Sequence, residues 1–198
     1  HGAGRGLSDL LAVFVGTGVG GGLILEDRLV VGPRGKAAEI GHVTVTPGGR
    51  PCGCGGAGHL ECYAGRAGMD AEVRRRVADG RTELLDELAG SGPVKSRHLA
   101  AGLEAGDATT AELLGQAADA LALVIGNATA LLDLPRVVLG GGVIDRLGQT
   151  FIDDIVASAH FGGFGPGSVE IQPAHRLDDG GVLGAAVLAA DQLVLTGG

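Results

Sequence analysis

Residues 41–61 read GHVTVTPGGRPCGCGGAGHLE, and this stretch carries the most specific signal in the chain. It gathers two histidines and two cysteines in one short segment. Zinc prefers four nitrogen or sulfur ligands in a tetrahedron, and a closed set of four is typical of a structural rather than a catalytic metal. The glycines around the cysteines allow the backbone to fold tightly enough to bring the ligands together. The stretch therefore predicts a loop closed by structural Zn²⁺, with His42, Cys52, Cys54 and His59 as its ligands.

Cys62 is the alternative to His59 as the fourth ligand. It follows Glu61 at the start of an expected helix, so its side chain would have to turn back toward the loop. We favour His59, and the choice between the two stays open at this point.

The second glycine cluster, GTGVGGG at 16–22, contains a literal G-x-G-x-x-G. A dinucleotide-binding fingerprint requires a helix directly afterwards. Here LILEDRLVV follows, which predicts strand, turn and strand, and there is no G-K-[ST] of a Walker loop. What remains is a glycine-rich hairpin whose backbone N–H groups and Thr17 hydroxyl could hold phosphate oxygens. The alternative is a hairpin shaped only for packing.

Apolar periodicity predicts the order of the elements. Strands are expected at 10–16, at 22–31 with a turn near Glu26 and Asp27, and at 43–46, 136–140 and 168–174. Helices are expected at 60–78, as short pieces within 82–106, from a Thr109–Thr110 cap to Asp133, and at 144–160 and 180–195. Strands that alternate with helices after an opening antiparallel run predict an α/β fold with a mixed sheet.

Length, charge and cysteine content narrow the classes of protein to which the chain can belong. The chain has 198 residues, enough for one domain, and no apolar run of the roughly 18–20 residues that cross a bilayer. The net charge of -8 argues against a broad nucleic-acid surface, and the Arg74–Arg76 run is expected to be a solvated helix face. Three cysteines do not suggest a disulfide framework, so a cytoplasmic location is expected. Because the chain begins with His1 and its one methionine is Met69, we expect a processed chain or a fragment.

Four segments resemble the ROK family of repressors and sugar kinases in order and spacing. They are GTGVGGGLILEDRLVVGPRGKAAEIGH at 16–42, CGCGGAGHLECYAG at 52–65, VVLGGGV at 137–143 and LDDGGVLGAAVLA at 177–189. The resemblance implies an actin-like (ribonuclease-H-like) sugar-kinase C-terminal lobe over residues 1–198, with a mixed sheet, flanking helices and a zinc loop at 39–61. The helix at 180–195 would then pack toward an N-terminal lobe.

The family's site residues can be placed by motif. The resemblance implies sugar binding by Glu39, His42 and Glu61, with His42 also binding the metal. It implies nucleotide binding by Thr17, Gly18, Gly140, Gly141 and Gly142. The implied ligands are a hexose resembling glucose, ATP with Mg²⁺, and structural Zn²⁺, and the implied assembly is a homodimer.

The chain departs from the family pattern in two places. The family's third metal cysteine is replaced by His59, another competent zinc ligand. The D-x-G-G-T motif and the N-D-A-N stretch with the catalytic aspartate do not occur, and HGAGRG at 1–6 resembles the segment that follows N-D-A-N. No residue is therefore assigned as catalytic, and the chain alone is expected to be inactive.

Two functions follow from these patterns. The first is the sugar- and nucleotide-binding lobe of an ATP-dependent hexose kinase. The alternative is the effector-binding domain of a sugar-responsive transcriptional regulator with a DNA-binding head. The upstream coding sequence would decide between them, because D-x-G-G-T marks the kinase and a helix-turn-helix marks the regulator.

Overall fold

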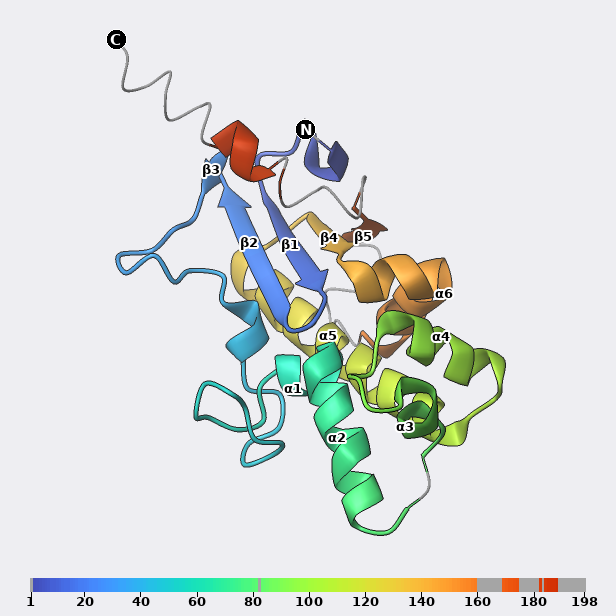
Figure 1. Ribbon diagram of the computed structural model, residues 1–198. Helices are drawn as coiled ribbons and strands as arrows, with labels where there is room; N and C mark the ends of the chain where they lie inside the picture. The colour runs from blue at the N-terminus through green and yellow to red at the C-terminus, as the bar shows by residue number, and fades with distance from the viewer. Residues whose placement is uncertain (1, 82, 160–168, 175–181, 183, 189–198) are drawn as a thin grey trace.

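A computed structural model shows one five-stranded sheet in the order β3-β2-β1-β4-β5, with a long helix behind it (Figure 1). The structure describes residues 2–81, 83–159, 169–174, 182 and 184–188. The strands β1, β4 and β5 run parallel, and β2 and β3 are antiparallel to their neighbours. The predicted α/β fold with a mixed sheet is therefore confirmed.

The elements follow the predicted order. The strands are β1 (Leu10–Val15), β2 (Val19–Leu25), β3 (Arg28–Leu29), β4 (Arg136–Gly140) and β5 (Glu170–Pro173). The α-helices are α1 (Glu61–Ala64), α2 (Arg66–Ala78), α3 (Leu84–Ala89), α4 (Ser96–Glu104), α5 (Ala108–Leu132) and α6 (Gly142–Ser158). Two short 3-10 turns are η1 (Gly2–Gly4) and η2 (Ile40–His42).

The core lies between the sheet and α5. Alternate residues of β1, Val13 and Val15, are fully buried, as a half-covered strand requires. Leu113, Leu121 and Ile125 of α5 are fully buried and belong to the same hydrophobic cluster. This packing fixes the carboxyl ends of β1 and β4, where the glycine turns lie.

The long helix α5 also passes a length and composition test for a membrane span, with a most apolar window of mean hydropathy 1.3. The helix has no uninterrupted apolar run of that length, because polar residues recur along it, and it passes only on average hydropathy. More than half of that window is buried inside the protein, which is how the core helix of a globular fold behaves.

Two local predictions need correction. The helix expected at 60–78 is present but divided into α1 and α2 at Gly65, a glycine that weakens its first turns and has extended backbone angles. A Cβ on Gly65 would lie 3.0 Å from the Cα of Gly18, so the break lets α1 and α2 meet the glycine turn closely. The strand expected at 43–46 is reduced to a single bridge between Thr44 and His59, because this segment turns to form the cysteine loop.

The cap of α5 also differs. Asp107, rather than Thr109 or Thr110, is the N-cap, and its carboxylate accepts hydrogen bonds from the backbone N–H and the hydroxyl of Thr110. The helix predicted at 180–195 falls mostly outside the described residues.

Candidate functional site

The two histidines and two cysteines of the loop converge on one point. One ligand atom from each of His42, Cys52, Cys54 and His59 lies within 4.8 Å of the other three. Cys54 Sγ is 3.4 Å from His59 Nδ1, and Cys52 Sγ is 3.9 Å from His42 Nδ1. Tetrahedral zinc with ordinary Zn–S and Zn–N bond lengths would separate such atoms by about 3.3–3.8 Å. The donor set and its spacing therefore fit a zinc ion after a small contraction.

Short backbone bridges close the loop around these ligands. Pro51 pairs with Ala57, and the Cys52 N–H donates to the Gly56 carbonyl at 2.9 Å. Cys62 lies outside the cluster, buried, with its Sγ 3.4 Å from the Pro51 carbonyl. The fourth position of the cluster is thus held by His59, and its use by a metal stays a prediction.

Glu61 lies between the cluster and the glycine turn. Its Oε1 is 3.0 Å from Cys52 Sγ and 3.7 Å from His42 Nδ1. Its Oε2 lies 2.8 Å from the position that a Cβ on Gly18 would occupy. One carboxylate therefore touches both of the motifs that the sequence singled out.

The hydrogen bond from Cys52 to Glu61 changes the acidity of the thiol. The backbone N–H of Cys54 lowers the pKa of Cys52, but the Glu61 carboxylate and burial outweigh it and raise the pKa to about 12. The thiol is therefore protonated at neutral pH while no metal is bound, and a metal would displace that proton.

Glu39 approaches the His42 ring at Nε2, the nitrogen opposite the one that Glu61 approaches. Its Oε2 is 4.0 Å from His42 Nε2, and its side chain is 60% exposed. The side chains of His42 and Glu61 are 40% and 26% exposed. The three residues predicted to bind sugar thus form one open, acidic surface around His42.

The two glycine motifs meet at the carboxyl edge of the sheet. The Gly16 N–H donates to the Gly18 carbonyl across the turn that joins β1 to β2. Gly141 has a φ of +91°, and a Cβ there would lie 2.5 Å from the Val15 carbonyl oxygen. Thr17 and Gly18 therefore lie at the same edge as Gly140, Gly141 and Gly142, the position where open α/β sheets bind ligands.

Comparison with known proteins shows the family. The sequence profile of the ROK family matches residues 1–192. The chain belongs to the ROK family. Within this family the His/Cys cluster is typical of the zinc-binding motif.

Three of its relatives show what this chain is similar to. It is 32% identical over 202 residues to a glucokinase of Thermotoga maritima, covering 97% of this chain and 61% of that protein. It is 34% identical over 187 residues to an N-acetylmannosamine kinase of Yersinia pestis, covering 93% and 58%. The structure of a Streptomyces griseus ROK glucokinase in complex with glucose and AMPPNP matches with a TM-score of 0.76 at 29% identity, covering 94% of this chain and 62% of that one. The chain thus spans about three fifths of the length of these relatives.

Sequence reasoning missed Arg50, which anchors the cysteine loop of this ROK chain. Its guanidinium donates to the Cys62 carbonyl at 3.1 Å and to Gln116 of α5 at 2.6 Å. It also lies 4.5 Å from the centre of the Tyr63 ring, and its Nε is 3.8 Å from Glu72. A positively charged residue just before the first cysteine was the available signal, but its partners are distant in sequence.

The arginine run of α2 is not a uniformly solvated face, contrary to the sequence prediction. Arg74 and Arg75 have side chains 45% and 59% exposed, whereas that of Arg76 is 4% exposed. Arg76 binds Glu72 through Nε at 2.8 Å and Glu112 of α5 through both Nη atoms, at 2.8 and 3.0 Å. This ion-pair network, centred on the buried Arg76 and Glu72, ties α2 to α5.

The network gives a pH-dependence prediction. Hydrogen bonds from Arg75 and Arg76, with the charge of Arg50, lower the pKa of Glu72 to about 2 despite the opposing effect of burial. A carboxylate with a lowered folded-state pKa stabilises the fold above its unfolded pKa, near 4.5, and loses that contribution as the pH falls toward 2. We expect Glu72→Gln to remove on the order of 2 kcal/mol of the acid dependence seen in wild type between those pH values.

Urea unfolding of both proteins at several pH values measures this difference. Exposed Glu87→Gln is the matched control and should keep the wild-type acid dependence. Equal acid dependence in wild type and Glu72→Gln would contradict the prediction.

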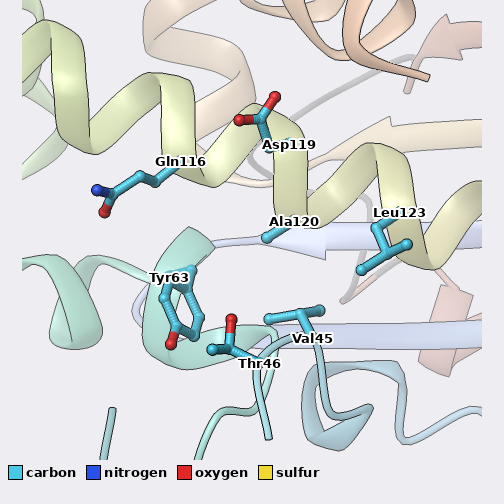
Figure 2. A pocket seen from close by; sticks show the side chains of 7 residues that line it. All are labelled: Val45, Thr46, Tyr63, Gln116, Asp119, Ala120 and Leu123. Carbon is cyan, nitrogen blue, oxygen red and sulfur yellow. The ribbon is translucent and has the colours of Figure 1, made fainter. Parts of the chain in front are cut away.

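A separate hollow of about 220 Å³ lies between α5 and the loop (Figure 2). Figure 2 shows Tyr63, Thr46 and Val45 facing Ala120 and Leu123, while the carboxylate of Asp119 points away from them. Its lining residues are Val45, Thr46, Tyr63, Gln116, Asp119, Ala120 and Leu123. They are different from the predicted site residues, so the candidate site is the open surface around His42 and not this hollow.

Proposed function

We propose that this chain is the sugar- and nucleotide-binding C-terminal lobe, residues 1–198, of an ATP-dependent hexose kinase. The observation that carries the proposal is the position of Glu61. Its carboxylate touches the His/Cys cluster with one oxygen and the glycine turn with the other. A group that accepts hydrogen bonds from a sugar and a turn that holds phosphate must be neighbours for phosphoryl transfer.

The sugar would be held by Glu39, His42 and Glu61. Ionised carboxylates accept hydrogen bonds from hydroxyl groups, and charge-assisted bonds of this kind are strong and directional. His42 Nε2 faces the Glu39 side of the ring. The names of the relatives, a glucokinase and an N-acetylmannosamine kinase, support a hexose as the substrate class.

His42, Cys52, Cys54 and His59 would hold a structural zinc ion. When bound, zinc supplies a redox-inert crosslink between the loop ligands. His42 and Cys52 each contact Glu61, so a loop held in place also holds the Glu61 carboxylate.

The phosphates of ATP, with Mg²⁺, would bind at the carboxyl edge of β1 and β4. Thr17 and Gly18 lie at the end of β1, and Gly140, Gly141 and Gly142 at the end of β4. The two glycine turns at this edge support the kinase over a purely sensory domain, because a sensor has less need of a phosphate site. A homodimer and a cytoplasmic location remain predictions.

Sugar binding by the 198-residue chain tests the proposal. We expect calorimetry to detect weak binding of glucose or N-acetylmannosamine, weakened at least about tenfold by Glu61→Gln because one charge-assisted bond is lost. Glu87→Gln, exposed on α3, is the matched control and should bind as wild type does. No binding of either sugar, or equal binding by Glu61→Gln, would contradict the assignment.

A coupled assay tests the expected absence of activity. These residues contain no counterpart of the N-D-A-N aspartate, so we expect no ATP-dependent sugar phosphorylation by this chain alone. Robust turnover would overturn that expectation.

A further inference from the structure

Arg66 lies against the glycine turn and was not singled out by the sequence. It is the first residue of α2, and its Nη2 donates to Thr17 Oγ1 at 2.9 Å. Its Nε is buried and has no hydrogen-bond partner among the described residues. Nε is enclosed by the protein, so the donors that remain for a ligand are those of the Nη atoms, beside the Thr17 hydroxyl.

The charge of Arg66 is also uncompensated. Within the described part of the chain, no carboxylate lies within 4.0 Å of its guanidinium. Six other arginines have such a partner, Arg50, Arg74, Arg75, Arg76, Arg81 and Arg136, whereas Arg5, Arg28, Arg34, Arg97 and Arg146 share the lack of one among the described residues; Arg66 differs from these five in donating to Thr17 of the glycine turn. In a chain with a net charge of -8, a cation without a carboxylate beside a phosphate-type turn favours an anionic ligand.

The first backbone N–H groups of α2 already have acceptors, so the side chain of Arg66, and not these amides, is available to bind an anion. The N–H of Arg66 donates to the Gly16 carbonyl at 3.1 Å, and that of Ala67 to the Thr17 carbonyl at 2.9 Å. These bonds occupy the first amides of the helix and fix Arg66 to the turn. Since Thr17 Oγ1 accepts from Arg66, its own hydroxyl hydrogen is free to point at a ligand oxygen.

We propose that Arg66 binds the phosphate chain of the donor, together with the Thr17 hydroxyl. The planar fork of a guanidinium matches two phosphate oxygens at once, which a single hydroxyl cannot do. The inference rests on the proposed function, because it names the residue that would hold the triphosphate at the same glycine turn.

Calorimetry tests the role of Arg66 by measuring how tightly the 198-residue chain binds inorganic tripolyphosphate. We expect Arg66→Gln to weaken binding at least about tenfold and Arg66→Lys to recover part of the loss, because lysine keeps the charge but not the fork. Arg28→Gln is the matched control. Arg28 lies in β3, which pairs with the end of β2 far from the Gly16–Gly18 turn, so its loss should change the affinity by less than about twofold.

Two further measurements separate binding from folding. The melting temperature and glucose binding of Arg66→Gln should equal those of wild type, and the salt dependence of tripolyphosphate binding should be shallower in the variant. Loss of glucose binding with a lowered melting temperature would show a structural role and overturn the inference.

The remaining outcomes distinguish this inference from the proposed function. If wild type and Arg66→Gln bind tripolyphosphate equally well, the role of Arg66 is wrong and the phosphate turn stands. If wild type binds no tripolyphosphate, both the inference and the phosphate part of the function are overturned. Failure of glucose binding alone would overturn the sugar assignment and leave the Arg66 result valid.

Discussion

Cys54→Ser is expected to lower the zinc content from about one ion per chain to less than about a tenth of that. Cys54 is exposed, and its Sγ lies 3.4 Å from His59 Nδ1, so the substitution removes a ligand with little change in packing. A serine hydroxyl is not among the groups that structural zinc sites use. Elemental analysis of freshly purified protein measures the effect. The melting temperature should fall as well, because a metal that binds only the folded chain stabilises it.

Cys62→Ser is the matched control for the same chemical change. Its thiol donates to the Pro51 carbonyl and is not one of the four grouped ligands, and a serine hydroxyl can still donate there, so zinc should be retained. His59→Ala should lose zinc as Cys54→Ser does. The opposite pattern, with zinc lost from Cys62→Ser and kept in His59→Ala, would make Cys62 the fourth ligand. Wild-type protein without zinc would refute the metal site itself.

Arg76→Met is expected to destabilise the fold by about 3 kcal/mol, because it removes a buried cation that pairs with the buried Glu72 carboxylate and with the half-exposed Glu112. Arg76 is 4% exposed and binds Glu72 on α2 and Glu112 on α5. Methionine fills a similar volume but cannot donate to either group. In a domain of this size the loss corresponds to a melting temperature lowered by about 6–12 °C.

Arg75→Met removes a second guanidinium from the same buried carboxylate, but from a side chain that is itself 59% exposed. Glu72 keeps Arg76 and Arg50, and water can replace the exposed Arg75 guanidinium, so we expect a loss of about 0–1 kcal/mol. Urea unfolding of both variants at neutral pH measures the contrast. If the two variants lost the same free energy of unfolding, the burial of Arg76 would not make its ion pairs more stabilising than those of Arg75.

The order of the elements was predictable because its signals are local. Runs such as LLAVFV at 10–15 and RVVLG at 136–140 are apolar over the length of one strand, and the glycine turn and Pro135 mark where elements end. The cysteine loop was predictable for a similar reason, since its four candidate ligands and their glycines fall in one segment. Gly65 and Gly68 mark the first turns of this helix as weak in the sequence, but the position of the break is explained by the close approach of Gly65 to Gly18, which is distant in sequence.

The partners of the arginines could not be predicted, because each pairing joins distant segments. Arg74, Arg75 and Arg76 are identical in composition, and only the packing of α2 against α5 decides which of them is buried. The same holds for Arg66, whose contact with Thr17 links residues 49 positions apart. Charge runs indicate exposure on average, but a single helix turn can place one member inside.

The break at Gly65 sets the relative position of Glu61, which is proposed to bind the sugar, and Arg66, which is proposed to bind the phosphate chain. In an unbroken helix, at 100° per residue, residues 61 and 66 would point about 140° apart around the axis, away from a common target. The joint at Gly65 redirects the second helix, so that Glu61 reaches the turn at Gly18 and Arg66 reaches it at Thr17. In the proposed kinase, one residue, Gly65, therefore sets the relative orientation of the sugar-binding Glu61 and the phosphate-binding Arg66. A change of backbone conformation at Gly65 would move both side chains together.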